Sequence, residues 1–77
     1  MKFEFITSDP QILGGKPIIK NTRISVDIIL EWIASGASIA DINKAHPQLA
    51  EAAIKEAVSY ASHFLHNELY IEIKSVA

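Results

Sequence analysis

The stretch SVDIILEWIASGASIADINKAHPQL, residues 25–49, carries the start and stop signals of two helices separated by a tight turn. Ser25 is a favourable N-cap residue, and the apolar residues after it recur at the i, i+3, i+4 and i+7 spacing of one helix face. Gly36 is suited to ending a helix, because glycine adopts positive φ angles at little cost. This part of the stretch therefore predicts a first helix over residues 26–35.

The second half of the stretch predicts a shorter helix over residues 38–44. Ser38 and Asp41 match a capping box, in which each side chain bonds the other residue's backbone N–H. The pair His46-Pro47 ends this helix, because the residue before a proline avoids the helical conformation. A short helix between two marked turns is the layout of a helix-turn-helix unit.

The residues after this stretch predict a long third helix over residues 48–67. Its apolar positions recur on one helix face over about four turns. They are Ala50, Ala53, Ile54, Ala57, Val58, Ala61, Phe64 and Leu65. The three helices predict a compact core over residues 26–67, within a mainly α fold that has short β segments.

Short β segments are predicted on both sides of this core. The N-terminal sequence KFEFIT alternates polar residues with Phe3 and Phe5, which is typical of a strand with one buried face. The tail alternates in the same way and predicts a C-terminal strand with apolar positions at Leu69, Ile71 and Ile73. An uncovered apolar strand promotes aggregation, so we expect these positions to form protein interfaces.

The stretch ILGGKPIIKNTRIS predicts a hairpin-like turn region ahead of the first helix. Gly14 and Gly15 shape a bend, where positive φ angles are available to glycine. Pro17 cannot donate a ladder hydrogen bond, which places it at a sheet edge. Asn21 tolerates the left-handed conformation and predicts a tight hairpin around residues 20–22.

Two functional interpretations of local patterns fail on the sequence. A phosphate-binding loop needs Ser or Thr directly after its lysine, whereas Pro17 follows Lys16 here, so the glycines are assigned to a structural turn. His63 and His66 have helical spacing, but two imidazoles are not a complete zinc site. We therefore expect no metal, no cofactor and no enzymatic activity.

The composition indicates one small domain with little net charge. The chain has 77 residues, a net charge of −2, 49% apolar residues and no cysteine. We expect a single domain over residues 1–77, made of a β-rich N-terminal segment (1–25), the helical core (26–67) and a C-terminal strand or tail (68–77). So small and apolar a chain is expected to form a homodimer, which covers part of its surface.

The composition also bears on the compartment. The absence of cysteine suits a cytoplasmic protein, and no apolar run reaches the length of a membrane span.

The motifs described above resemble those of a bacterial and archaeal family, the domain of unknown function 433. Its typical pattern is I-x-x-D/N-P-x-I-x-G-G-K-P-x-I-x-G-T-R-I-x-V, followed by a helix, S-I-x-E/D-I and a Y-P-x-L turn. The chain carries matching residues from about Ile6 to Leu65, with GGKP and TRI as the most specific elements. It departs from the pattern at Asn21, where glycine is usual, at His46, where tyrosine is usual, and at Ala50, where Ser or Thr often caps the third helix.

The resemblance implies a winged-helix or homeodomain-like helix-turn-helix fold. It also implies an antitoxin of a type II toxin–antitoxin pair, which neutralises a PIN-like ribonuclease toxin and regulates its own operon by binding operator DNA. The alternative that the acidic balance favours is a homo-oligomeric protein-interaction module that binds no DNA.

Candidate contact residues follow from charge and amphipathicity. The expected DNA contacts are Lys16, Lys20, Arg23, Gln48 and Lys55. The expected protein contacts are Phe3, Phe5, Trp32, Leu69, Ile71 and Ile73. For Arg23 a structural role stays open, in which its guanidinium pairs with a carboxylate such as Asp9 or Asp27.

Overall fold

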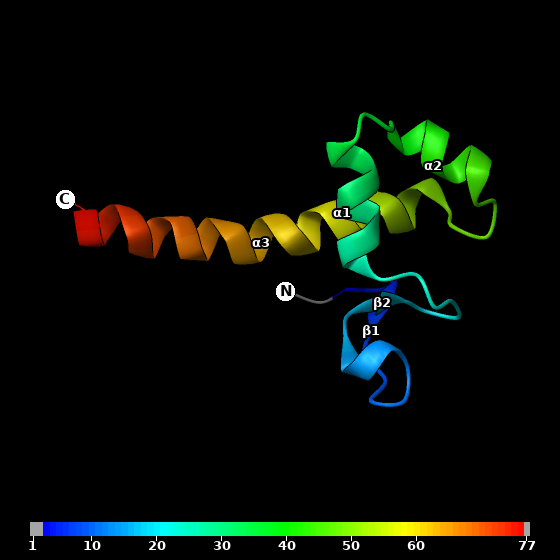
Figure 1. Cartoon of the computed structure of the whole chain (residues 1–77), viewed down its shortest axis with the longest axis horizontal. Helices are drawn as coiled ribbons and strands as arrows, with labels where there is room; N and C mark the ends of the chain where they lie inside the picture. Colours follow the sequence, from blue (N-terminus) through cyan, green and yellow to red (C-terminus); the bar gives the residue numbers. More distant parts are fainter. Residues whose placement is uncertain (1–2, 77) are drawn as a thin grey trace.

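The computed structural model describes the backbone of residues 3–76 and the side chains of residues 3–63. In this part of the chain three helices follow a two-stranded sheet, which confirms the predicted mainly α fold with short β segments. The elements in chain order (Figure 1) are β1 (Ile6–Thr7), the 3₁₀ helix η1 (Leu13–Gly15), β2 (Ile18–Ile19), α1 (Val26–Ala34), α2 (Ile39–Ala45) and α3 (Glu51–Val76).

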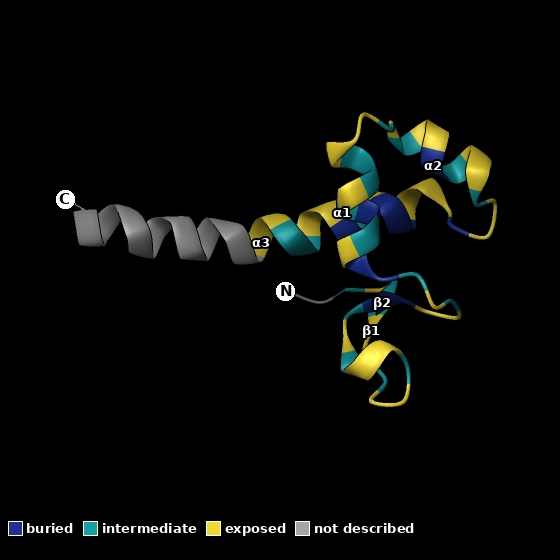
Figure 2. Cartoon of the chain, in the orientation of Figure 1, coloured by how far each residue is buried: buried dark blue, intermediate teal, exposed yellow. Residues whose placement is uncertain are grey.

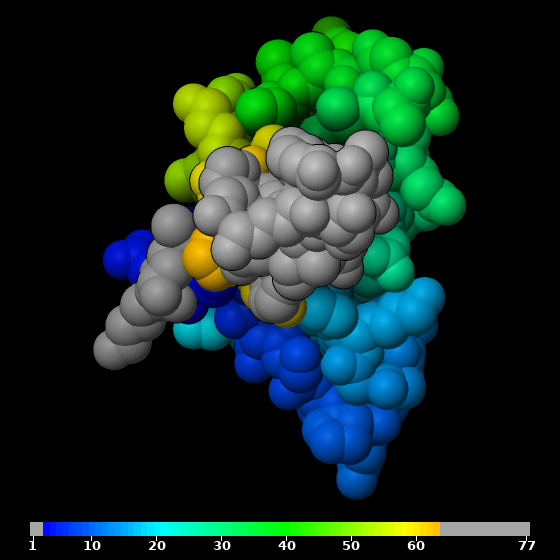
Figure 3. Space-filling view, turned by 90° about the vertical axis from the view of Figure 1, so that its left-hand side faces the viewer, coloured from blue at the N-terminus to red at the C-terminus, as the bar shows by residue number. Residues whose placement is uncertain are grey.

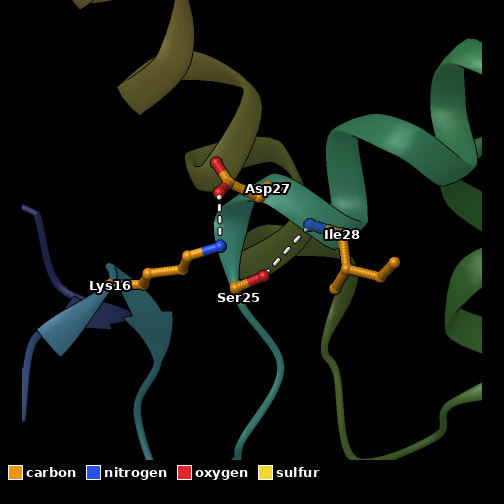
Figure 4. Close-up of polar contacts among 4 residues, drawn as sticks. All are labelled: Lys16, Ser25, Asp27 and Ile28. Carbon is orange, nitrogen blue, oxygen red and sulfur yellow. Dashed lines mark hydrogen bonds and ion pairs between the residues drawn. The ribbon is translucent and has the colours of Figure 1, made fainter. Parts of the chain in front are cut away.

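The first helix begins where the sequence predicts, because Ser25 caps it. The Ser25 hydroxyl accepts a hydrogen bond from the Ile28 N–H at 3.1 Å (Figure 4). Asp27 in the first turn places a negative charge at the positive end of the helix dipole. Gly36 follows the last turn with a φ of 107°, a conformation that side chains disfavour.

The second helix carries the predicted capping box. The Asp41 N–H donates to the Ser38 hydroxyl at 3.0 Å, and the Ser38 N–H donates to Asp41 Oδ2 at 2.9 Å. The Ser38 N–H that bonds the Asp41 carboxyl, together with the Ser38 side chain, keeps the pKa of that carboxyl below its ordinary value of 3.8. The predicted helix over residues 38–44 is confirmed to within one residue at each end.

The third helix begins at Glu51, later than the predicted start at Gln48. The residues between α2 and α3 form a hydrogen-bonded loop instead of a helical turn. The Leu49 N–H donates to the His46 carbonyl at 2.8 Å, and Asn43 Nδ2 donates to the Leu49 carbonyl at 2.6 Å. Asn43 therefore ties this loop to α2 and holds it in position ahead of α3.

The C-terminal strand predicted over residues 69–73 is replaced by helix, since α3 continues through this segment to Val76. A strand must find a neighbouring strand for its backbone groups, whereas a helix satisfies them within the segment. The continued helix extends from the packed core (Figure 1) and contributes to a longest dimension of 44 Å. The predicted interface side chains Leu69, Ile71 and Ile73 lie outside the residues whose side chains are described.

The hydrophobic core lies where α1, α2 and β2 pack against the first turns of α3 (Figure 2). Ile29 of α1, Leu49 of the loop and Ile54 of α3 are completely shielded from solvent. The other members of this core are Ile19, Val26, Ile42, Ala53 and Ala57. Ala53 and Ala57 of the predicted apolar stripe lie in this core, whereas Ala50 and Val58 of the same stripe are exposed.

The N-terminal segment folds as an antiparallel ribbon. β1 pairs with β2 in the register Ile6↔Ile19 and Thr7↔Ile18, so the N-terminal strand is shorter than predicted. Its neighbour in the sheet is β2. Figure 3 shows this segment at one end of the molecule, with α1 and α2 at the other.

The positive φ angles predicted for the glycine bend and for Asn21 are confirmed. Gly14 and Gly15 have φ angles of 65° and 87°, and Asn21 has a φ of 65°. The Ile19 N–H donates to the Ile24 carbonyl at 2.9 Å, which closes the hairpin around Asn21. Leu13 also has a positive φ, of 49°, which the sequence did not predict.

Asn21 offers a direct test of this turn, because its side chain is exposed and only its backbone angle is demanding. We expect Asn21→Gly to leave the free energy of unfolding nearly unchanged. Asn21→Val is expected to lower it by about 1–2 kcal/mol, the cost of a left-handed conformation for a residue with a crowded Cβ. Urea denaturation followed by circular dichroism measures both, and equal stability of the two variants would contradict the assigned turn.

A carboxylate on α3 holds the start of the N-terminal segment. The Glu56 carboxylate accepts the Glu4 N–H at 2.8 Å and, through its other oxygen, the Phe5 N–H. The Phe3 ring meets the Tyr60 ring edge-on, with centroids 5.0 Å apart. Phe3 and Phe5 thus both take part in packing within the chain, and their role in a partner interface stays a prediction.

Candidate functional site

The turn after β2 is built to hold Arg23 in a fixed place. The Thr22 hydroxyl donates to the Ile19 carbonyl at 2.8 Å and accepts the Ile24 N–H at 3.0 Å. These bonds tie both arms of the turn to one side chain. The Arg23 backbone is therefore well defined, while its side chain is exposed.

Arg23 lies at a groove of about 850 Å³ that is formed by three separate segments. They are residues 7–10 and 12 of the N-terminal segment, Ile18 of β2 with the turn after it, and Gln48 in the loop before α3. The polar side chains of the lining are Thr7, Ser8, Asp9, Asn21, Thr22, Arg23 and Gln48. The apolar ones are Pro10, Ile12, Ile18 and Ile24. The turn after β2 and the loop between α2 and α3 lie on the same side of the molecule, at the right of Figure 1.

The charged side chains of the N-terminal turns differ in whether they form an ion pair. Lys16 Nζ lies 3.5 Å from Asp27 Oδ2 (Figure 4), and both side chains are well exposed. Asp9 shares the groove with Arg23, and its Oδ1 accepts the Gln11 N–H at 2.9 Å. Among residues 3–63, Arg23 forms no ion pair. Its pairing with Asp9 or Asp27, left open by the sequence, is therefore not observed.

The structure brings together two of the five predicted DNA contacts. Arg23 and Gln48 line one groove, whereas Lys16, Lys20 and Lys55 do not line it. Lys20 and Lys55 are exposed elsewhere on the surface. The sequence offered Asp9 only as a possible ion-pair partner of Arg23 and did not single out Thr7 or Ser8, because these residues meet Arg23 through the pairing of β1 with β2.

The start of α3 is poorly suited to reading DNA bases. Glu51 is exposed in its first turn, and the side chains of Ala50 and Ala52 beside it carry no hydrogen-bonding group. Base edges in the major groove are usually contacted by Arg, Lys, Asn or Gln near the start of a recognition helix. Gln48 and Lys55 alone meet that description in the first part of α3 and the loop before it.

Trp32 borders a second, smaller hollow of about 260 Å³ between α1 and α2. Its indole stacks on the His46 imidazole, with ring centroids 4.6 Å apart and planes inclined by 11°. This stacking explains the half-buried state of Trp32 within the chain itself. Its role in a protein interface stays a prediction.

Metal binding and membrane insertion each need a recognisable feature among the described residues. No group of three or more His, Cys, Asp or Glu residues is placed to hold a metal ion there. Within the same residues, no helix combines the length and hydropathy needed to span a bilayer.

The fold and groove define a class of small helical protein in which a two-stranded ribbon packs beside the start of a long third helix. Residues 6–61 match the family described as "Protein of unknown function (DUF433)". The match covers most of the chain, so the chain belongs to this family, as its GGKP and TRI elements predicted.

Two relatives illustrate the extent of this similarity. The chain is 38% identical over 58 residues to the uncharacterized protein y4eO of Sinorhizobium fredii, a match covering 75% of the chain. That match spans only 26% of y4eO, about a quarter of its length. A crystal structure of a DUF433 member from Anabaena variabilis is similar with a TM-score of 0.73 and 26% identity, covering 91% of this chain and 68% of that one.

Proposed function

We propose that the chain is an antitoxin of a type II toxin–antitoxin pair. In this proposal it binds and neutralises a PIN-like ribonuclease toxin and regulates its own operon by binding operator DNA as a homodimer. Its α2, loop and α3 act as a helix-turn-helix unit packed on α1. The proposal rests on the family to which the chain belongs and on the placement of its polar side chains.

One observation carries the DNA-binding part. Arg23 and Gln48 lie far apart in the sequence but line one groove, beside the loop that leads into α3. A ribbon with a cationic turn next to the start of a third helix is an arrangement that suits contact with a duplex. A dimer would present two such edges, which doubles the phosphate contacts of a weakly charged protein.

The toxin-binding part is supported by the extended third helix. α3 runs beyond the core formed with α1 and α2 (Figure 1), and helices that project in this way supply surface for a partner protein. Val58 of α3 and Leu13 of η1 are large apolar side chains that lie outside the core and are exposed. Such a projecting helix is where we place contact with the toxin.

The function is tested by two assays on the intact chain. A mobility-shift assay with DNA from upstream of its own gene is expected to show binding that weakens steeply between 50 and 200 mM salt, on the order of tenfold or more. Co-expression with a PIN-like ribonuclease encoded beside it is expected to restore growth that the ribonuclease alone arrests. Failure of both assays would reject the proposal.

A homo-oligomeric interaction module without DNA binding is the second candidate. It is favoured by the exposed Glu51 at the start of α3 and by the net charge of −2, since both repel phosphates. If co-expression restores growth but the chain binds no DNA at low salt, the result supports a protein-interaction module that does not bind DNA.

A further inference from the structure

We infer that the groove lined by Arg23 binds the phosphodiester backbone of nucleic acid and that Asp9 in the same groove lowers the affinity for it. The exposed face of α3 is then not the main contact. This inference rests on the DNA binding proposed above and deepens it. It names the residue that binds, the group that it binds and the residue that opposes binding.

The Arg23 side chain is accessible to an anion. It is exposed at the groove and forms no ion pair with any carboxylate among residues 3–63. Of the two other cations in the N-terminal turns, Lys16 already lies against Asp27, and Lys20 is exposed outside the groove. Arg23 is thus a cation whose planar, five-donor head is available to a phosphate, which it can bind in bidentate fashion.

Side-chain hydrogen bonds fix two of the backbone segments that form the groove. The Thr22 hydroxyl fixes the turn that carries Arg23, and the Asn43 amide fixes the loop that carries Gln48. Hydroxyl and amide side chains of Thr7, Ser8, Asn21 and Gln48 supply further neutral donors around the guanidinium. Hydroxyl, amide and guanidinium donors held by a fixed backbone are the usual partners of phosphate oxygens.

The other charged side chains of the groove and of α3 also affect the binding of a phosphate. Asp9 lies in the same groove, and its negative charge repels a phosphate. Its Oδ1 accepts a hydrogen bond from the Gln11 N–H of the same turn. An asparagine keeps that acceptor oxygen and loses the charge. On α3, by contrast, the negative charge of the exposed Glu51 offsets the positive charge of Lys55, so this helix face attracts a phosphate only weakly.

The test is fluorescence anisotropy of the full chain with a labelled duplex from upstream of its own gene, at several salt concentrations. We expect Arg23→Ala to weaken binding about tenfold and to lower the salt slope by about one unit. Asp9→Asn is expected to tighten binding about threefold at low salt, because a nearby like charge is removed. Lys44→Ala, which removes an exposed cation of α2 outside the groove, is the matched control and is expected to change affinity less than about twofold.

The outcomes separate this inference from the proposed function. A wild-type chain that binds no duplex at low salt would reject the proposed DNA binding itself. Wild-type binding with Arg23→Ala and Asp9→Asn both equal to Lys44→Ala would overturn the groove assignment alone. Should Arg23→Ala lose its fold by circular dichroism, Asp9→Asn still decides, because weaker or unchanged binding contradicts the inference. The same variants on single-stranded RNA of equal length show whether the groove takes duplex DNA only or any phosphodiester chain.

Discussion

Replacing Ile54 by alanine is expected to lower the free energy of unfolding by about 3 kcal/mol or more. Ile54 is completely buried on the face of α3 that packs against α1 and α2. Its removal loses apolar burial and leaves a cavity that closely packed neighbours cannot fill. A domain of this size has little stability in reserve, so the variant should be largely unfolded at 37 °C.

Val58→Ala is the matched control for Ile54→Ala. Val58 lies one helical turn further along α3 and is 37% exposed, so the same class of substitution there should cost less than about 1 kcal/mol. Urea denaturation followed by circular dichroism at 222 nm measures both variants. Equal losses of stability would mean that the start of α3 is not the buried centre of the molecule.

The second large effect is expected at Glu56, whose carboxylate accepts two backbone N–H groups of the N-terminal segment. We expect Glu56→Ala to lower the free energy of unfolding by about 2 kcal/mol, because hydrogen bonds to charged groups are worth more than neutral ones. The N–H groups of Glu4 and Phe5 should then exchange with solvent faster than in the wild type. Hydrogen exchange followed by NMR measures this change directly.

Glu51→Ala serves as the control for Glu56→Ala, because it removes an exposed carboxylate from the same helix. Its loss affects only a favourable interaction with the start of α3, worth about 0.3–1 kcal/mol. Unchanged amide exchange at Glu4 and Phe5 in Glu56→Ala would show that the N-terminal segment is held by other contacts.

The helices of the core could be predicted because their boundaries depend on local chemistry. Ser25 and Ser38 each cap the helix that follows, and Gly36 marks the turn between the first two helices. These signals depend on neighbours within three or four residues, which the sequence displays directly. The left-handed turn at Asn21 could be predicted for the same reason.

The ends of the chain were predicted less well, because their structure depends on distant partners. Alternation over residues 69–73 fits a strand only where another strand lies alongside, and here α3 continues instead. The bonds from the N-terminal segment to Glu56 join residues more than 50 positions apart. No local pattern around Glu4 or Phe5 indicates that contact.

The candidate site was half predictable. Arg23 and Gln48 stand out in the sequence as donors in an acidic chain, but their common groove arises from the tertiary fold. Lys16 was expected to face a partner, and its contact with Asp27 appears only in the structure. Asp9, which opposes anion binding in that groove, was considered in the sequence only as a partner for Arg23.

An NMR titration of the isotope-labelled chain with its upstream duplex tests the central claim most directly. The account predicts that the backbone amides of residues 7–9, Ile12, residues 21–24 and Gln48 shift together, since they line one groove. Shifts confined to the exposed face of α3 around Glu51 and Lys55, with the groove amides unmoved at saturation, would contradict it.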